Sequence, residues 1–198
     1  TAYVAVAPDN SVKIYAINPE LGQGITPSFD LLIAEELDAD WSTVKVLQAP
    51  TSPTLYGQQS SGGSMSTPRC WDAMRQAGAT ARAMLVAAAA EQWKVPASEC
   101  TTTKSMVTHG ASGRKASYGA LAPAAGKLPV PDAKTLTLKT RQEYKLLGTR
   151  VSQVDSGALV TGQGLFGIDV RLPRMVYANY TKCPAVGGRL GQPAGTGR

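Results

Sequence analysis

Two glycine-rich loops are the segments of this chain best suited to bind a charged group. They are Gly22-Gln23-Gly24-Ile25-Thr26-Pro27 and Gly62-Gly63-Ser64-Met65-Ser66-Thr67-Pro68. Glycine lets the backbone approach a ligand, and each threonine is placed to cap a helix that begins at the following proline. A helix start carries unpaired N–H groups and partial positive charge, so it attracts anions. The loops therefore predict sites for the phosphates of one large cofactor. The alternative is that they are ordinary turns before capped helices, which bind nothing.

No complete catalytic set accompanies the two loops. The sequence has no GxSxG, HExxH, P-loop or Rossmann fingerprint. Its one histidine, His109, lies in a loop-like context where a structural role is commoner than general base catalysis. The cysteines have no CxxC spacing, and we expect Cys70, Cys100 and Cys183 to be free, buried and apolar in character. We assign no catalytic or metal-ligating residue, and a cofactor site without a catalytic set suggests part of a larger active site.

Composition and charge restrict the classes of protein. The 198 residues are 43% hydrophobic and 17% charged, which is enough for a packed core. No apolar run approaches the ~20 residues of a membrane span, and no leader peptide is visible at the start. Residues 1–60 carry a net charge of −5 and the remainder +11. The basic side chains of the remainder are scattered singly, without interleaved aromatic residues, which favours a solvated surface over a nucleic-acid interface.

Hydrophobic spacing indicates the elements that would position the loops. Residues 2–6, 11–16 and 43–48 are expected to form short strands. A helix is expected over about 27–37, with its acidic residues Asp30, Glu35, Glu36 and Asp38 facing away from the core. A polar loop over 49–67 leads to a second helix over about 68–94. The apolar stripe of this second helix is Trp71, Met74, Ala77, Ala81, Met84, Leu85 and Ala88.

The second half of the chain is expected to be richer in strands. Residues 101–109 are predicted to be one strand, and Ser117 is placed to cap a helix over 118–126. Residues 134–139 are predicted to be a strand or extended segment, and a domain boundary is expected near 140. Strands are expected over 164–170 and 175–181, and a flexible tail over 187–198. Strands mixed with helices, without a regular βαβ alternation, favour the α+β class.

Nine short motifs occur in an order and spacing that resemble one family. They are Glu20-Leu-Gly-Gln-Gly-Ile-Thr26, Ile33-Ala-Glu-Glu-Leu-Asp38, Gly62-Gly-Ser-Met-Ser-Thr67, Tyr118-Gly-Ala-Leu-Ala122, Leu146-Leu-Gly148, Val160-Thr-Gly162, Phe166-Gly-Ile-Asp-Val170, Leu172-Pro-Arg-Met-Val-Tyr-Ala178 and Cys183-Pro184. Together they resemble the molybdopterin-binding large (beta) subunits of the isoquinoline 1-oxidoreductase type, within the xanthine dehydrogenase and aldehyde oxidase family.

The resemblance implies a fold and a cofactor. Residues 1–140 would form a portion of the molybdopterin-binding domain, and 141–198 the beginning of an α/β hammerhead domain with a flexible tail. The cofactor would be molybdopterin in its cytosine dinucleotide form. The implied cofactor-binding residues are Gly22, Gln23, Gly24, Thr26, Gly62, Gly63, Ser64, Met65, Ser66 and Thr67.

The resemblance also implies a reaction and partners. Such enzymes are molybdenum hydroxylases that oxidise N-heterocycles or aldehydes with oxygen derived from water. The partners would be the remainder of the large subunit, a small subunit with [2Fe-2S] clusters and a cytochrome acceptor. The compartment would be the periplasm or the cytoplasm, with the periplasm favoured.

The chain also departs from the family pattern. The GxGE-type element with the family's glutamate base, its GFGG-type loop and its arginine element are absent from the sequence. We therefore expect an N-terminal piece of a longer subunit that is inactive alone. Two alternatives stay open at this point: a non-catalytic module that binds a phosphorylated ligand, and, less favoured, a nucleic-acid-binding domain.

Overall fold

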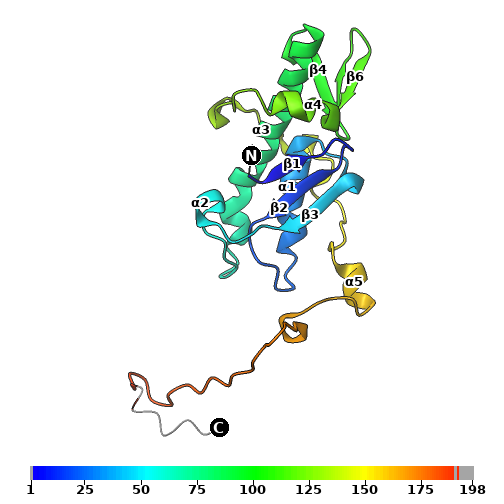
Figure 1. The fold of residues 1–198 in the computed structure, drawn as a ribbon. Coiled ribbons are helices and arrows are strands. Elements are labelled where there is room, and N and C mark those ends of the chain that lie inside the picture. Colours follow the sequence, from blue (N-terminus) through cyan, green and yellow to red (C-terminus); the bar gives the residue numbers. More distant parts are fainter. Residues whose placement is uncertain (1, 190, 192–198) are drawn as a thin grey trace. The chain divides into compact units, whose positions relative to one another are not determined.

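A three-stranded sheet and two long helices form the main body of the structure, a computed structural model that describes residues 2–189 and 191 (Figure 1). The sheet consists of β1 (Val4–Val6), β2 (Val12–Ala16) and β3 (Val44–Gln48), in that order. β1 is antiparallel to β2, whereas β3 is parallel to β2 with Val12 opposite Val44. A parallel pair needs a crossover connection, and here the crossover contains helix α1 (Ile25–Leu37).

Helix α1 packs along helix α3 (Ser66–Trp93), and both cover the buried face of the sheet. β2 alternates as the sequence predicts, with Val12, Ile14 and Ala16 buried and Lys13 exposed. Gly78 of α3 lies against α1. A Cβ at this position would clash with the Ile33 carbonyl and lie 2.9 Å from the Glu36 Cβ. The absence of a side chain at Gly78 therefore permits the close helix contact.

Both helices begin earlier than the sequence predicts, so the expected threonine caps are wrong. The N-cap of α1 is Gly24, in the left-handed region with φ 76°, and the N-cap of α3 is Met65. Thr26 and Thr67, each with the proline after it, lie inside the first turn. Proline is tolerated there because the first N–H groups of a helix have no partner within the helix.

The expectation that the acidic residues of α1 face away from the core is also wrong. All four are buried: Asp30, Glu35, Glu36 and Asp38. Basic side chains from distant segments explain three of them. Glu36 forms an ion pair with Arg75 of α3 at 2.7 Å, and Glu35 forms one with Lys139 at 2.9 Å. The helical period alone could not reveal these partners.

The segment 139–147 is held on α1 by this buried charge network. Lys139 Nζ donates to Glu35 Oε1 and, at 2.8 Å, to Asp38 Oδ1. Glu35 Oε2 accepts the N–H groups of Lys145, Leu146 and Leu147 at 2.6–3.0 Å. Burial raises the pKa of Glu35, but these hydrogen bonds outweigh it and leave the pKa lowered. The carboxylate therefore stays ionised and anchors the segment.

A second antiparallel sheet consists of β4 (Cys100–Thr103), β5 (Met106–His109) and β6 (Arg114–Ser117). The single strand expected over 101–109 is therefore a hairpin. Its turn residues, Lys104 and Ser105, both have positive φ, and the buried Ser105 donates its N–H to the Asp38 carbonyl at 2.9 Å. This long-range contact fixes a turn that residue types alone do not indicate.

The remaining elements are short. Helix α4 (Tyr118–Ala125) begins as predicted, with the Ser117 hydroxyl accepting from the Ala120 N–H at 3.2 Å. Residues 134–139 contain the end of a 3₁₀ turn followed by extended chain, with no strand partner among the residues that the structure describes. The other short elements are η1 (Trp41–Thr43), α2 (Pro53–Tyr56), η2 (Ala97–Glu99), η3 (Ala133–Thr135), η4 (Arg141–Glu143), α5 (Ser156–Val160) and η5 (Gly167–Asp169).

The contacts of the chain group residues 1–157 into one unit and 158–198 into a second. The strands expected over 164–170 and 175–181 are not formed, and only η5 interrupts the irregular backbone there. Ile168, Val176 and Tyr180 are exposed. A strand needs hydrogen-bonded neighbours, which this unit does not supply within its described residues. The domain boundary near 140 stays a prediction, and most of the expected tail (190 and 192–198) lies outside the described residues.

Within the part of the chain that the structure describes, no helix is long and apolar enough to cross a membrane, and no cluster of three His, Cys, Asp or Glu side chains could hold a metal ion.

Candidate functional site

The two glycine loops lie side by side, although long stretches of chain separate them. The first connects β2 to α1 and the second connects α2 to α3. The Ser61 hydroxyl donates to the Pro19 carbonyl at 2.8 Å, and Asn18 Nδ2 donates to the Ser60 carbonyl at 2.6 Å. Asn18 Nδ2 also donates to Ser66 Oγ at 3.0 Å, which ties the first loop to the start of α3.

A cavity of about 420 Å³ opens between the loops. Six of the ten residues predicted to bind a cofactor line it: Gln23, Gly24, Gly62, Ser64, Ser66 and Thr67. Gly22, Thr26, Gly63 and Met65 lie in the same loops but do not line this cavity. Leu21, Ile25, Ser28 and Ser61 complete the lining, and sequence reasoning did not single them out. The structure thus brings the two predicted segments together at one opening.

The two helix starts differ in what they offer an anion. At α1, the carboxylate of Glu20 accepts the N–H groups of Gly22, Gly24 and Thr26, so an anion of the chain itself already fills the start. At α3 the N-cap residue is Met65, no side-chain hydrogen bond caps the helix within the described residues, and Arg69 lies in the first turn. An uncapped start beside a guanidinium favours a negatively charged ligand.

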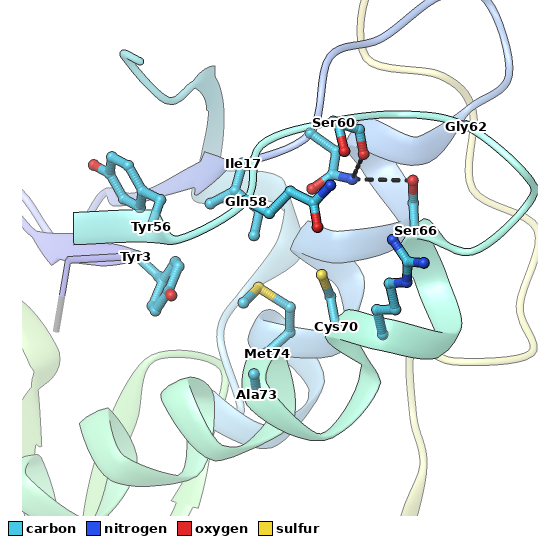
Figure 2. A pocket seen from close by; sticks show the side chains of 12 residues that line it. Tyr3, Ile17, Tyr56, Gln58, Ser60, Gly62, Ser66, Cys70, Ala73 and Met74 are labelled. Atoms are coloured by element: carbon cyan, nitrogen blue, oxygen red, sulfur yellow. Dashed lines mark hydrogen bonds between the residues drawn. The ribbon is translucent and has the colours of Figure 1, made fainter. Parts of the chain in front are cut away.

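A second cavity, of about 260 Å³, adjoins the start of α3 and shares Gly62 and Ser66 with the first (Figure 2). Tyr3 and Tyr56 lie at one end of it and Ser60 and Ser66 at the other. The rings of the two tyrosines are 5.7 Å apart and tilted. The cavity therefore combines an aromatic wall with a polar end.

Asn18, which sequence reasoning missed, lines this second cavity. The residue is only 3% exposed, and its Oδ1 has no hydrogen-bond partner within the described chain. A buried acceptor without a donor costs free energy, so the site favours a ligand group or water that donates a hydrogen bond there. The sequence signal for Asn18 was its position two residues after β2 and before the first glycine loop.

Neither Cys70 nor His109 offers catalytic chemistry. Burial raises the pKa of the Cys70 thiol, which lines the second cavity, so the thiol is protonated at neutral pH. His109 is buried, and its ring forms hydrogen bonds with the Glu99 carboxylate at 2.8 Å and the Ser112 hydroxyl at 2.7 Å. Both ring nitrogens are therefore engaged in structural contacts. All three cysteines are free, as expected, but Cys183 is exposed and the other two are half-buried, so the expectation of buried cysteines is wrong.

Comparison with known proteins identifies the family of this chain. Residues 1–168 match the molybdopterin cofactor-binding domain family, and the chain belongs to this family. The resemblance inferred from the motifs is thereby confirmed.

Three characterised relatives are similar over most of this chain. It is 34% identical to the beta subunit of isoquinoline 1-oxidoreductase from Brevundimonas diminuta, over 93% of this chain and 28% of that protein. It is 33% identical to a membrane-bound aldehyde dehydrogenase (pyrroloquinoline-quinone) of Gluconacetobacter polyoxogenes, over 89% of this chain and 23% of that protein. It is 27% identical to a nicotinate dehydrogenase subunit from Pseudomonas putida, over 98% of this chain and 16% of that protein. The chain therefore spans less than a third of each relative.

Solved structures agree on the fold. The chain resembles a Cu,Mo-CO dehydrogenase with a TM-score of 0.51 and 23% identity, over 61% of this chain and 15% of that one. A reconstituted CO dehydrogenase from Oligotropha carboxidovorans gives the same TM-score at 22% identity, with the same coverage. At this identity the likeness concerns the fold alone. The likeness supports the mixed α+β fold, and the family match identifies it as a portion of a molybdopterin-cofactor-binding domain.

Proposed function

We propose that this chain supplies part of the molybdopterin site of a molybdenum hydroxylase that oxidises N-heterocycles or aldehydes. One observation carries the proposal: two glycine loops from distant parts of a molybdopterin-family chain meet at one cavity beside the uncapped start of α3. The names of the relatives, an isoquinoline oxidoreductase and an aldehyde dehydrogenase, support the two substrate classes.

The residues at the loops fit a large, phosphate-bearing cofactor in three respects. Gly62 borders both cavities, and a Cβ there would meet nothing within 4 Å, so the backbone is open to a ligand. The start of α3, with Arg69 in its first turn, favours a phosphate. The Asn18 Oδ1, which has no partner in the described part of the chain, favours a donor group such as the N–H or amino groups of a pterin or cytosine ring.

The division of labour follows from this arrangement. When bound, molybdopterin supplies the two-electron oxidation in which the substrate carbon gains an oxygen derived from water. The residues of this chain bind and orient the cofactor, and we propose none of them as a catalytic residue. The direct cofactor contacts we propose are Asn18, Arg69 and the six predicted loop residues that line the cavity. For Gly22, Thr26, Gly63 and Met65 we propose a role in shaping the two loops around the cofactor.

The wider assembly is proposed on the same basis. The cofactor would be the cytosine dinucleotide form, and electrons would leave through [2Fe-2S] clusters of a small partner subunit to a cytochrome. Residues 1–140 would be a portion of the cofactor domain and 141–198 the beginning of an α/β hammerhead. The remainder of the large subunit would supply the catalytic glutamate, and the periplasm is the favoured compartment.

Replacement of Gly62 by valine tests the proposal. Unlike Gly24 and Gly63, Gly62 does not have a positive φ, so a side chain there blocks the ligand's approach without straining the backbone. We expect Gly62→Val to lower the molybdenum and molybdopterin content of the complete enzyme at least ten-fold, measured by elemental analysis and pterin fluorescence. The matched control is Gly110→Val, at another open glycine without positive φ, in the β5–β6 turn. Unchanged molybdenum content in Gly62→Val would contradict the proposal.

A further inference from the structure

Glu20 has an unusual set of partners just ahead of the first glycine loop. Its Oε1 accepts the Gly22 N–H at 2.8 Å and the Gly24 N–H at 2.9 Å. Its Oε2 accepts the Thr26 N–H at 3.0 Å. Both carboxylate oxygens are therefore engaged by backbone groups of the loop and of the first turn of α1.

These hydrogen bonds stabilise a loop conformation that would otherwise be loose. Gly22 and Gly24 have φ of 95° and 76°, and glycine loses more conformational freedom on ordering than any other residue. Burial of the half-buried Glu20 raises its pKa, but the N–H groups of Thr26, Gly24 and Gly22 outweigh this effect and leave the pKa lowered. Glu20 is consequently an anion at neutral pH.

The ordered loop in turn places Gln23 against the second loop. Gln23 Oε1 accepts the Leu21 N–H at 2.5 Å, and its Nε2 donates to the Pro19 carbonyl at 3.1 Å. Nε2 also lies 3.4 Å from Ser61 Oγ, across the gap between the loops. Gln23 lines the shared cavity, so the conformation set by Glu20 determines where this side chain meets a ligand.

We propose that Glu20 is a positioning residue of the cofactor site. Its carboxylate fills the anion-binding start of α1, fixes the backbone of residues 22–26 and orients Gln23 toward the cavity. The start of α1 is thus closed to phosphate, and the cofactor's phosphates lie at the start of α3. The part of this inference that concerns the cofactor rests on the proposed function, whereas the ordering of the loop stands by itself.

Hydrogen exchange of the full chain, followed by mass spectrometry, tests the ordering. In Glu20→Ala we expect the amides of Gly22, Gly24 and Thr26 to exchange at least ten-fold faster than in the wild type, because the carboxylate that accepts their N–H groups is gone. Added formate, a small carboxylate, is expected to slow this exchange again in Glu20→Ala and to change nothing in the wild type, where the start is filled. The matched control is Glu91→Gln, which removes an exposed carboxylate from α3 and should leave the loop unchanged.

Rescue by formate distinguishes a filled anion site from general destabilisation, which an added anion would not reverse. Glu20→Gln, which keeps one acceptor oxygen, should exchange at an intermediate rate and serves if the alanine variant does not fold. Unchanged exchange in both variants, or equal slowing of the wild-type loop by formate, would overturn the inference.

The molybdopterin content of the complete enzyme tests the cofactor part. We expect Glu20→Ala to retain at least five-fold less molybdopterin than the wild type and Glu91→Gln to retain all of it. A fast-exchanging variant with full cofactor content would overturn the positioning role. A wild-type enzyme without molybdopterin would instead refute the proposed function, and the exchange data would still decide whether Glu20 orders the loop.

Discussion

Asp30 is the one acidic residue of α1 whose burial no cation explains. It is 0% exposed, and both carboxylate oxygens lack a hydrogen-bond partner within the described chain. Burial raises the pKa of Asp30 to about 8, because an ion without partners is unfavourable in an apolar interior. The folded protein therefore holds a neutral carboxyl group at pH 7, whereas the unfolded chain holds a carboxylate.

This difference makes stability depend on pH. Below about pH 4 the Asp30 carboxyl is protonated in both the folded and the unfolded state, so its ionisation does not affect the free energy of unfolding. As pH rises toward 8 the unfolded state is increasingly favoured by ionisation, at about 1.4 kcal/mol per pH unit, and above 8 the cost is constant. We expect Asp30→Asn to remove this dependence, so that its gain in Tm over the wild type grows from pH 4 to pH 8. Parallel curves of Tm against pH, from thermal unfolding, would contradict this assignment.

At the scale of elements, the contact between α1 and α3 depends on a single glycine. Alanine is a better helix former than glycine by about 1 kcal/mol, so replacing an open helical glycine by alanine normally stabilises the folded protein. At Gly78 the added Cβ would meet backbone of α1, which cannot move aside cheaply. We expect Gly78→Ala to lower the free energy of unfolding by roughly 1–3 kcal/mol, measured by denaturant titration. Gly157→Ala in the short helix α5, where a Cβ meets nothing within 4 Å, is the control and should not lower the free energy of unfolding.

The attachment of residues 139–147 to α1 depends on Lys139. Its removal would leave the carboxylates of Glu35 and Asp38 buried with fewer partners. Breaking a buried ion pair from one side typically costs about 3–5 kcal/mol, and Lys145 still contacts Asp38, so we expect the lower end for Lys139→Met. Denaturant unfolding measures the loss, and Lys134→Met, at an exposed lysine, is the control. Equal stability of the two variants would show that the network is not stabilising.

At the scale of the whole molecule, the second unit exposes many large apolar side chains. They include Leu165, Phe166, Ile168, Leu172, Val176, Tyr177 and Tyr180. Apolar groups that remain exposed promote association. We expect the 198-residue chain alone to form dimers or aggregates, and Ile168→Lys with Val176→Lys to reduce this association. Sedimentation of the unmodified chain as a monodisperse monomer in analytical ultracentrifugation would contradict the expectation.

The sequence by itself determined the elements whose signals are local. The alternation in β2, the Ser117 cap of α4 and the apolar periods of α1 and α3 all depend on residues close together in the chain. One member of the apolar stripe predicted for α3 is wrong, because Trp71 is exposed. The nine short motifs were also sufficient to identify the family. The starts of both long helices shifted because a left-handed glycine and an uncapped methionine replaced the expected threonine caps.

Only the tertiary structure decided which polar groups are satisfied, because their partners are distant in sequence. It buried Glu35 and Glu36 against Arg75 and Lys139, and it left Asp30 without a partner within the described residues. It also showed that Glu20 fills the start of α1, whereas among the described residues the start of α3 has no side-chain cap and the Asn18 Oδ1 beside it has no donor. Helical and strand periods report which positions are apolar, whereas the burial of a charge depends on a counter-ion that only folding brings near.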